Sequence, residues 1–265
     1  MSEVQDSIEK IRSHLKGIDS CFIDRSDHIR MMGICAMSRI PMLLVGSPGT
    51  AKTDVVSTFA NHLNVDDYFE YTLNKFTEPA EVFGPIDISS LKEGRQLRIT
   101  KGFLPTAKIA FLDEIFKANS AILNSFLTIL NERKFSQDGK SIQVPLRFAF
   151  AASNEIPENP DLAAITDRFV VKAEFKPVKD QYLGDLIAKS IDNKKNKLVN
   201  YKPNHGCSIE DYDNVYNYLQ NMSKNVKGNE FVKQTFEQNA WVEFSNLLFS
   251  VEKDHKIKIS DRKKI

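Results

Sequence analysis

Short apolar runs alternate with helical patterns along the middle of the chain. In a helical pattern the apolar residues recur every three or four positions, whereas each short run is apolar throughout, as in a strand buried on both faces. Five runs read as strands: residues 42–46, 68–73, 108–114, 147–154 and 169–175. Strands and helices in alternation are typical of a parallel sheet that is covered on both faces. The pattern therefore predicts an α/β fold with a five-stranded, mostly parallel sheet.

The patterns on either side of this region are helical. Apolar residues at helical spacing continue from the amino terminus to about Ala36, and strand signals stop after Pro177. Helical periodicity returns at 211–222 and 240–251, after a polar stretch that predicts a loop. We therefore expect an α/β core with its amino-terminal helices over residues 1–177 and a smaller all-helical lid subdomain over 178–265. The chain ends on charged residues without a helix cap, which indicates that this lid is truncated.

Composition narrows the class of protein. The 265 residues are 42% hydrophobic and 27% charged, a profile typical of soluble globular proteins. The net charge of +1 gives no overall attraction to nucleic acid or to anionic membranes. Three widely separated cysteines indicate neither a disulfide framework nor a zinc site. No apolar run is long enough to span a membrane and no signal peptide is evident, so we expect a cytoplasmic protein.

The loop after the first predicted strand carries candidate chemistry. Its residues are Gly46, Ser47, Pro48, Gly49, Thr50, Ala51, Lys52 and Thr53, followed by Asp54 at the start of a predicted helix. In a phosphate-binding loop the backbone N–H groups and the helix amino terminus face phosphate oxygens. The lysine then reaches the β- and γ-phosphates and the Thr53 hydroxyl binds Mg²⁺. The alternative is a glycine-rich strand-to-helix turn with an exposed lysine.

Two residues of this loop depart from the usual motif. Alanine occupies position 51, where the phosphate-loop pattern has glycine. The methyl group costs little if the residue is already helical, but it is strained if the backbone needs a positive φ. Asp54 would repel phosphate if it faced the ligand, and we expect it to face solvent.

A second candidate cluster follows the third predicted strand. Asp113 and Glu114 stand at its carboxyl end, the edge at which parallel α/β sheets bind ligands. Asp113 would hold Mg²⁺, and Glu114 would polarise the water that attacks the γ-phosphate. Alternatively, the two carboxylates only cap the next helix.

Taken together, these motifs resemble those of the MoxR group of AAA+ ATPases, and closely those of its RavA subgroup. The resemblance runs from Gly46 to Arg262 and is carried by these segments: "GSPGTAKT", "FTEPAEVFGP", "GFLPTAKIAFLDEIFKANSAILNSFLTILNERKF", "FAFAASNEIP", "ITDRF" and "SDRK". It implies an AAA+ P-loop core that binds ATP and Mg²⁺ and hydrolyses ATP. It also implies that alanine is tolerated before the loop lysine.

The resemblance assigns three further residues. Asn154 matches the residue that reads the γ-phosphate and orients water, although an Asn at a strand end also commonly starts a turn. Arg168 matches the arginine that a neighbouring subunit contributes, whereas an Arg beside an Asp is ordinarily a surface pair. Arg262 matches a lid arginine that contacts the γ-phosphate of its own chain.

Two segments resemble family insertions. Residues 83–105 predict a β-hairpin around "KEGR", and 132–148 predict a second hairpin with Asp138-Gly139 as its turn. In ring ATPases such hairpins face the pore or a partner, but plain exposed hairpins fit the pattern equally. Arg133 is a candidate for the subunit interface.

The leading functional hypothesis is an ATPase ring, a hexamer by family expectation, that remodels or assembles a protein client. The resemblance implies chaperone-like activity, often with a von Willebrand factor A domain partner. A nucleic-acid motor is an alternative, because Lys92, Arg95, Arg98 and Lys101 cluster in the first insertion, although the near-zero net charge disfavours it. A third hypothesis is a nucleotide-gated scaffold with little turnover.

Overall fold

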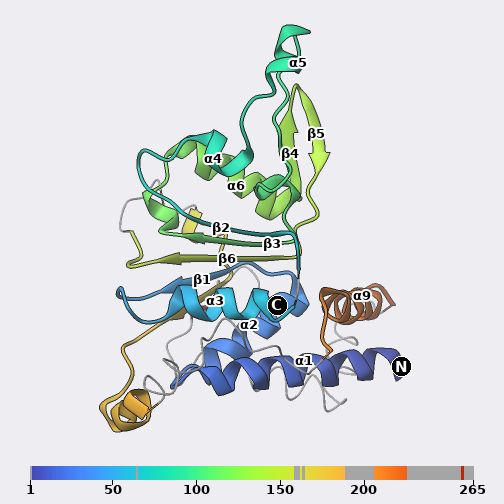
Figure 1. Ribbon diagram of the computed structural model, residues 1–265. Helices are drawn as coiled ribbons and strands as arrows, with labels where there is room; N and C mark the ends of the chain where they lie inside the picture. Colours follow the sequence, from blue (N-terminus) through green and yellow to red (C-terminus); the bar gives the residue numbers. More distant parts are fainter. Residues whose placement is uncertain are drawn as a thin grey trace.

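A mostly parallel sheet is the centre of the molecule, with helices on both faces (Figure 1). The computed structural model describes residues 2–63, 65–157, 162, 165–188, 206–225 and 258–259. The sheet has the strand order β2-β3-β6-β1-β7-β8. Its strands are β1 (Met42–Val45), β2 (Tyr68–Thr72), β3 (Ile109–Asp113), β6 (Phe148–Ser153), β7 (Val171–Glu174) and β8 (Lys258–Ile259). The first five are parallel and are the five predicted strands, so the predicted α/β fold is confirmed.

The central strands are buried on both faces, which explains why they read as continuous apolar runs. Leu44 pairs with Ala152 of β6 on one side and with Ala173 of β7 on the other. Alternate residues of each strand enter two different cores: Leu44 packs in one and Leu43 in the other. The carboxyl ends of β1, β3 and β6 therefore meet at one edge of the sheet.

One core lies between the sheet and a layer of helices. These are α1 (Ser2–Cys21), α2 (Ser26–Ser38), α3 (Lys52–Asn61) and α9 (Ile209–Asn225), which Figure 1 shows on the same face. α9 falls in the segment predicted as the lid, and the helical periodicity there is confirmed. Tyr212 of α9 is fully buried against Phe59, and its hydroxyl lies 2.9 Å from His14 Nδ1 of α1. This helix thus closes the core that the amino-terminal helices share with the sheet.

The strand β8 departs from the sequence prediction. It pairs antiparallel with β7, in a segment for which we expected only helices. Lysine and isoleucine alternate over residues 256–259, a pattern that suits an edge strand but is too short to stand out from a helical context. The predicted helical stretch at 240–251 lies outside the described residues.

The other core lies on the opposite face, under α4 (Pro79–Phe83) and α6 (Ser120–Glu132). Next to it β4 (Lys134–Gln137) and β5 (Lys140–Gln143) form the predicted second hairpin. Asp138 and Gly139 both have positive φ, 51° and 69°, as the first and second central residues of a tight hairpin turn require. This prediction is confirmed.

The hairpin predicted for the first insertion is largely wrong. Its tip is a short helix, α5 (Ile88–Lys92), and only the bridge between Ile86 and Arg98 pairs the two arms as strands. Asp87 caps this helix by accepting a hydrogen bond from the Ser89 N–H, and local capping prevailed over the alternating pattern. The two insertions project together (Figure 1), joined by a bond of 3.0 Å from the Gln96 N–H to Asp138 Oδ1. Among the described helices, none is both long and apolar enough to cross a membrane.

Candidate functional site

The loop at residues 46–51 leaves the carboxyl end of β1 and leads into α3, as the sequence predicted. Gly46 allows the close approach of β7 to this loop, since a Cβ at this position would lie 2.1 Å from the Phe175 carbonyl oxygen. Gly49 has a φ of 78°, a conformation that glycine adopts at little cost. The loop backbone therefore has two places where a side chain is excluded or costly.

Ala51 has a φ of 65° and a ψ of 26°, in the left-handed region. Of the two alternatives that the sequence left open, the strained one is present, and the methyl group costs about 1–2 kcal/mol in this conformation. Asp54 lies in the first turn of α3 and is exposed. The strain at Ala51 persists because the sheet and the helix fix both ends of the loop.

Replacing Ala51 by glycine is expected to raise the free energy of unfolding by about 0.5–1 kcal/mol, because relief of the strain outweighs the added freedom of the unfolded chain. The measurement is chemical denaturation of both proteins. Ala121→Gly is the matched control: Ala121 is exposed within α6, so the same change should lower stability by about 0.5–1 kcal/mol. Equal losses for both variants would show that Ala51 is not strained.

Lys52, the first residue of α3, is buried and its ammonium group is turned back onto the loop. Its Nζ donates to the carbonyl oxygens of Gly46 at 2.5 Å and Ser47 at 3.1 Å, and to Asn154 Oδ1 at 3.4 Å. Burial lowers the pKa of Lys52, while the charges of Asp113 and Glu114 oppose that shift. The alternative of an exposed lysine on a plain turn is therefore wrong. A phosphate oxygen would compensate this cation better than neutral carbonyls do.

Asp113 is the last residue of β3 and lies beside the first turn of α3, which follows the loop at residues 46–51. Its Oδ2 accepts a hydrogen bond of 3.2 Å from Thr53 Oγ1, and its Oδ1 accepts one from the Glu114 N–H. Glu114 takes a left-handed backbone with a φ of 54°, and its side chain does not cap the turn that follows. Asn119 caps α6 instead, by accepting a bond from the Ile122 N–H. The two carboxylates are therefore not explained as helix caps.

Asn154 connects the lysine to the second carboxylate. Its Nδ2 donates to Glu114 Oε1 at 2.5 Å, while its Oδ1 accepts from Lys52. Lys117 forms an ion pair with the same Glu114 oxygen at 3.2 Å, and the Glu114 side chain is 17% exposed. Three segments far apart in the sequence thus meet at one edge of the sheet, as the strand ends predicted.

The residues fit a magnesium triphosphate. A hydroxyl and a carboxylate oxygen 3.2 Å apart, from Thr53 and Asp113, match two adjacent positions of an octahedral magnesium ion, which lie about 3 Å apart at the usual 2.1 Å bond lengths. The buried ammonium group and the loop N–H groups supply the positive potential that phosphate requires. The hydroxyl, carboxylate, ammonium and backbone N–H groups are all available without a change in secondary structure.

Arg168 lies away from these residues in its own chain. It lies three residues before the start of β7, whose residue Val171 pairs with Met42, the first residue of the parallel strand β1. Arg168 is therefore at the amino-terminal edge of the sheet, whereas Lys52 is beyond the carboxyl edge. Its side chain is exposed. Arg262 lies outside the described residues.

Sequence reasoning missed Arg25, which is 3% exposed and directly precedes α2. Its Nη2 donates to the carbonyl oxygens of Thr50 at 3.1 Å and Lys176 at 2.8 Å, and its guanidinium group lies over the Phe175 ring. Burial lowers its pKa. Arg25 ties the loop to the chain just after β7. No pattern in the sequence marks it, because its acceptors are backbone groups.

A parallel α/β sheet with a glycine-marked loop after β1 and an acidic pair after β3 defines the P-loop class of proteins, here in its AAA+ form. The chain belongs to the MoxR family: the profile of bpMoxR, the MoxR domain in the MoxR-vWA-beta-propeller ternary systems, matches residues 9–210.

Two curated relatives and one solved structure are similar to the chain. Two uncharacterized proteins of Methanocaldococcus jannaschii are 37% and 38% identical to the chain over 235 and 211 residues, 86% and 79% of the chain. The matched regions span only 61% and 54% of those two proteins. A crystal structure from Cytophaga hutchinsonii, assigned as an ATPase, has a TM-score of 0.62 and 17% identity, covering 89% of this chain and 69% of that one. This last likeness concerns the fold alone.

Proposed function

We propose that the chain is the motor domain of a magnesium-dependent ATPase. The observation that carries this proposal is the hydrogen-bonded series from Lys52 through Asn154 to Glu114, beside the Thr53–Asp113 pair. The Lys52 ammonium group, the Asn154 amide and the Glu114 carboxylate belong to one network, which supports their proposed roles as cation, sensor and base. The loop residues 46–54 would hold the nucleotide, with Arg262 of the lid as a further contact.

The roles of the side chains follow from their positions. Lys52 exchanges its carbonyl partners for phosphate oxygens when ATP enters. Asn154 positions the Glu114 carboxylate through its hydrogen bond. Glu114 then accepts a proton from the attacking water. Asp113 and Thr53 would hold Mg²⁺, which when bound neutralises charge on the β- and γ-phosphates.

Replacing Lys52 by alanine tests the proposal at the binding step. A charge-assisted hydrogen bond to phosphate contributes about 1.5–3 kcal/mol, so we expect ATP to bind about 10–100-fold more weakly. The measurement is calorimetric titration with Mg-ATP, with phosphate release followed in parallel. Lys16→Ala removes an exposed lysine of α1 and should change neither quantity. Unchanged ATP affinity in Lys52→Ala would contradict the proposal.

The subgroup, the oligomeric state and the partner are proposed from the resemblance to the family. We propose a RavA-like, cytoplasmic homo-oligomer, a hexameric ring in which Arg168 completes the site of the adjoining subunit. An active site shared head-to-tail requires a ring or a filament. The family description names von Willebrand factor A domain systems, which supports such a domain as the partner. We propose a chaperone-like role on this partner. Residues 178–265 would contribute the lid subdomain, of which the described helix α9 packs against the core.

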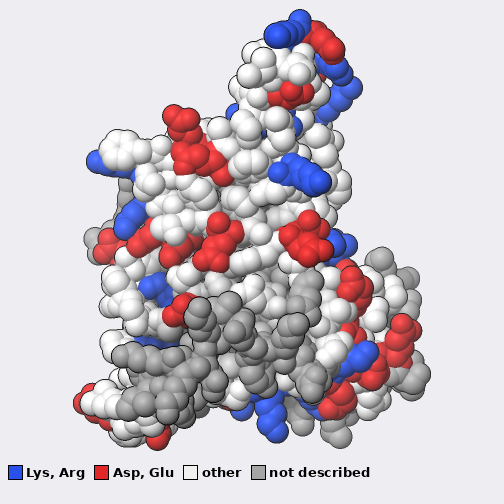
Figure 2. Space-filling model, in the orientation of Figure 1, with Lys and Arg blue, Asp and Glu red and all other residues white. Residues whose placement is uncertain are grey.

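The two alternative functions have less support. In the first insertion Arg95 pairs with Glu93, and Arg98 Nη1 donates to the Gly84 carbonyl oxygen at 2.7 Å. Figure 2 shows acidic as well as basic side chains at the tip of this projection. A nucleic-acid motor needs a less compensated basic surface. A scaffold without turnover does not require the full network around Glu114.

A further inference from the structure

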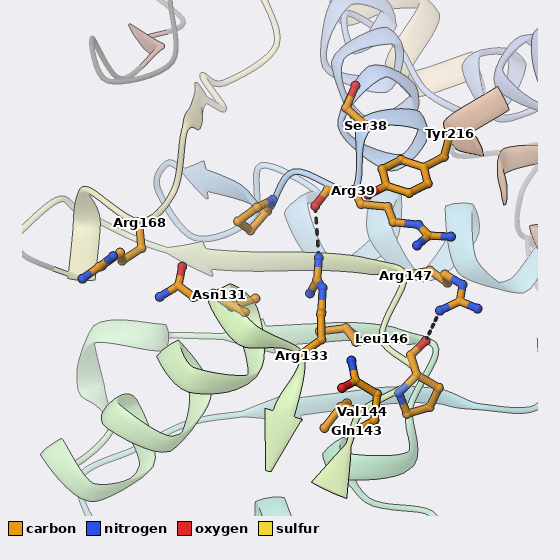
Figure 3. A pocket seen from close by; sticks show the side chains of 13 residues that line it. Ser38, Arg39, Asn131, Arg133, Gln143, Val144, Leu146, Arg147, Arg168 and Tyr216 are labelled. Atoms are coloured by element: carbon orange, nitrogen blue, oxygen red, sulfur yellow. Dashed lines mark hydrogen bonds between the residues drawn. The ribbon is translucent and has the colours of Figure 1, made fainter. Parts of the chain in front are cut away.

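A polar pocket lies at the opposite edge of the sheet from the proposed ATP site. It has a volume of about 590 Å³ and is lined by residues that precede β1 and β6 and that follow α6. Four arginines line it: Arg39, Arg133, Arg147 and Arg168 (Figure 3). The ring of Tyr216, from α9, forms part of its wall and stacks on Arg39, whose guanidinium carbon lies 3.8 Å from the ring centroid.

Positive charge exceeds negative charge around this pocket. Asp213 is the acidic residue that pairs there: its Oδ1 accepts from Arg39 at 2.6 Å and its Oδ2 from Arg147 at 2.9 Å. One carboxylate thus serves two guanidinium groups. Within the described part of the chain, Arg133 and Arg168 form no ion pair.

Arg133 is the most poorly compensated of the four. Its Nη2 donates to the Arg39 carbonyl oxygen at 3.0 Å, as Figure 3 shows, whereas its Nη1 is buried without a hydrogen-bond partner. Burial lowers its pKa, and the neighbouring charges of Arg39 and Arg147 lower it further. A buried guanidinium nitrogen that has no acceptor, in a group that lies near other cations, is costly unless an anion joins it.

We propose that this arginine pocket is an anion site that takes phosphate oxygens, separate from the phosphate-binding loop of the same chain. Guanidinium groups bind phosphate through paired N–H donors. A polyphosphate carries several negative charges, which matches two uncompensated arginines better than a single carboxylate does. The pocket volume of about 590 Å³ is also larger than the space that a single carboxylate group occupies. The site would take the phosphate groups of a free small molecule, which goes beyond the proposed contact of Arg168 with the ATP of an adjoining copy.

Inorganic pyrophosphate is the probe for this site. The Lys52→Ala chain is titrated calorimetrically at concentrations where it is monomeric, so that the phosphate loop contributes little. We expect one bound pyrophosphate, with affinity at least 10-fold weaker in Lys52→Ala/Arg133→Gln and in Lys52→Ala/Arg147→Gln. Lys52→Ala/Arg30→Gln is the matched control, because Arg30 is an exposed arginine of α2, and it should bind as the parent does.

Arg133→Gln with an intact Lys52 should still bind Mg-ATP like the native chain. Retained ATP binding keeps a failure of this inference distinct from a failure of the ATP site. Circular dichroism and thermal melting verify that each variant is folded. The inference is overturned if pyrophosphate does not bind the Lys52→Ala chain, or if the folded Arg133→Gln and Arg147→Gln variants of that chain bind it as the parent does.

Discussion

Glutamine in place of Glu114 is expected to leave ATP bound while phosphate release falls by about 10²–10⁴-fold, the range that general-base catalysis contributes. The amide has nearly the shape of the carboxylate, and its oxygen can still accept the hydrogen bond from Asn154 Nδ2. It cannot take a proton from water. Binding and hydrolysis should therefore separate, as measured by calorimetric titration with Mg-ATP and by steady-state phosphate release.

Glu132→Gln is the matched control for this experiment. Glu132 ends α6 and is exposed, so its amide should bind and hydrolyse ATP like the native chain. If the native chain and Glu114→Gln release phosphate at the same slow rate while both bind ATP, the scaffold alternative is correct and Glu114 is not a base.

Alanine in place of Arg168 is expected to lower phosphate release by about 10³-fold or more, the contribution of arginines that act in trans on a transferring phosphoryl group. ATP should bind normally, because Arg168 lies at the other edge of the sheet from Lys52 of its own chain. The expected loss is therefore confined to turnover. Arg30→Ala, which removes an exposed arginine of α2, should hydrolyse ATP at the native rate.

Mixing Arg168→Ala with Glu114→Gln distinguishes a shared site from a local defect. At a hybrid interface the Arg168→Ala chain supplies an intact Glu114, and its Glu114→Gln neighbour supplies an intact Arg168. Phosphate release should rise above that of either variant alone and depend on the mixing ratio. Absence of any rise, with mixed oligomers demonstrated by sedimentation, would contradict a site completed by a second copy.

The sheet was predictable because its strands are buried on both faces. Runs such as residues 148–152 are apolar throughout, and the lengths and spacing of these runs fit a parallel sheet. The convergence of Thr53, Asp113 and Asn154 follows from the same topology, since parallel strands end at one edge. These features depend on patterns that repeat within a short stretch of sequence.

Other features depend on contacts between distant segments and escaped prediction. Arg25 acts on two carbonyl groups, 25 and 151 residues further along the chain, which no local pattern records. The conformation of Ala51 depends on how β1 and α3 fix the loop ends, so the sequence left two alternatives. At α5 the alternating pattern suggested a hairpin, but capping by Asp87 produced a helix. The arginine pocket joins residues from α2, α6 and α9 that appear unrelated in sequence.

The most direct test of the central claim is a crystal structure of the Glu114→Gln chain grown with Mg-ATP. The account predicts the triphosphate over residues 46–53, with Lys52 Nζ bonded to phosphate oxygens in place of the Gly46 and Ser47 carbonyls. Magnesium should lie beside Thr53 Oγ1 and Asp113. A triphosphate bound elsewhere, or Lys52 still bonded to the loop carbonyls at saturating ATP, would contradict it.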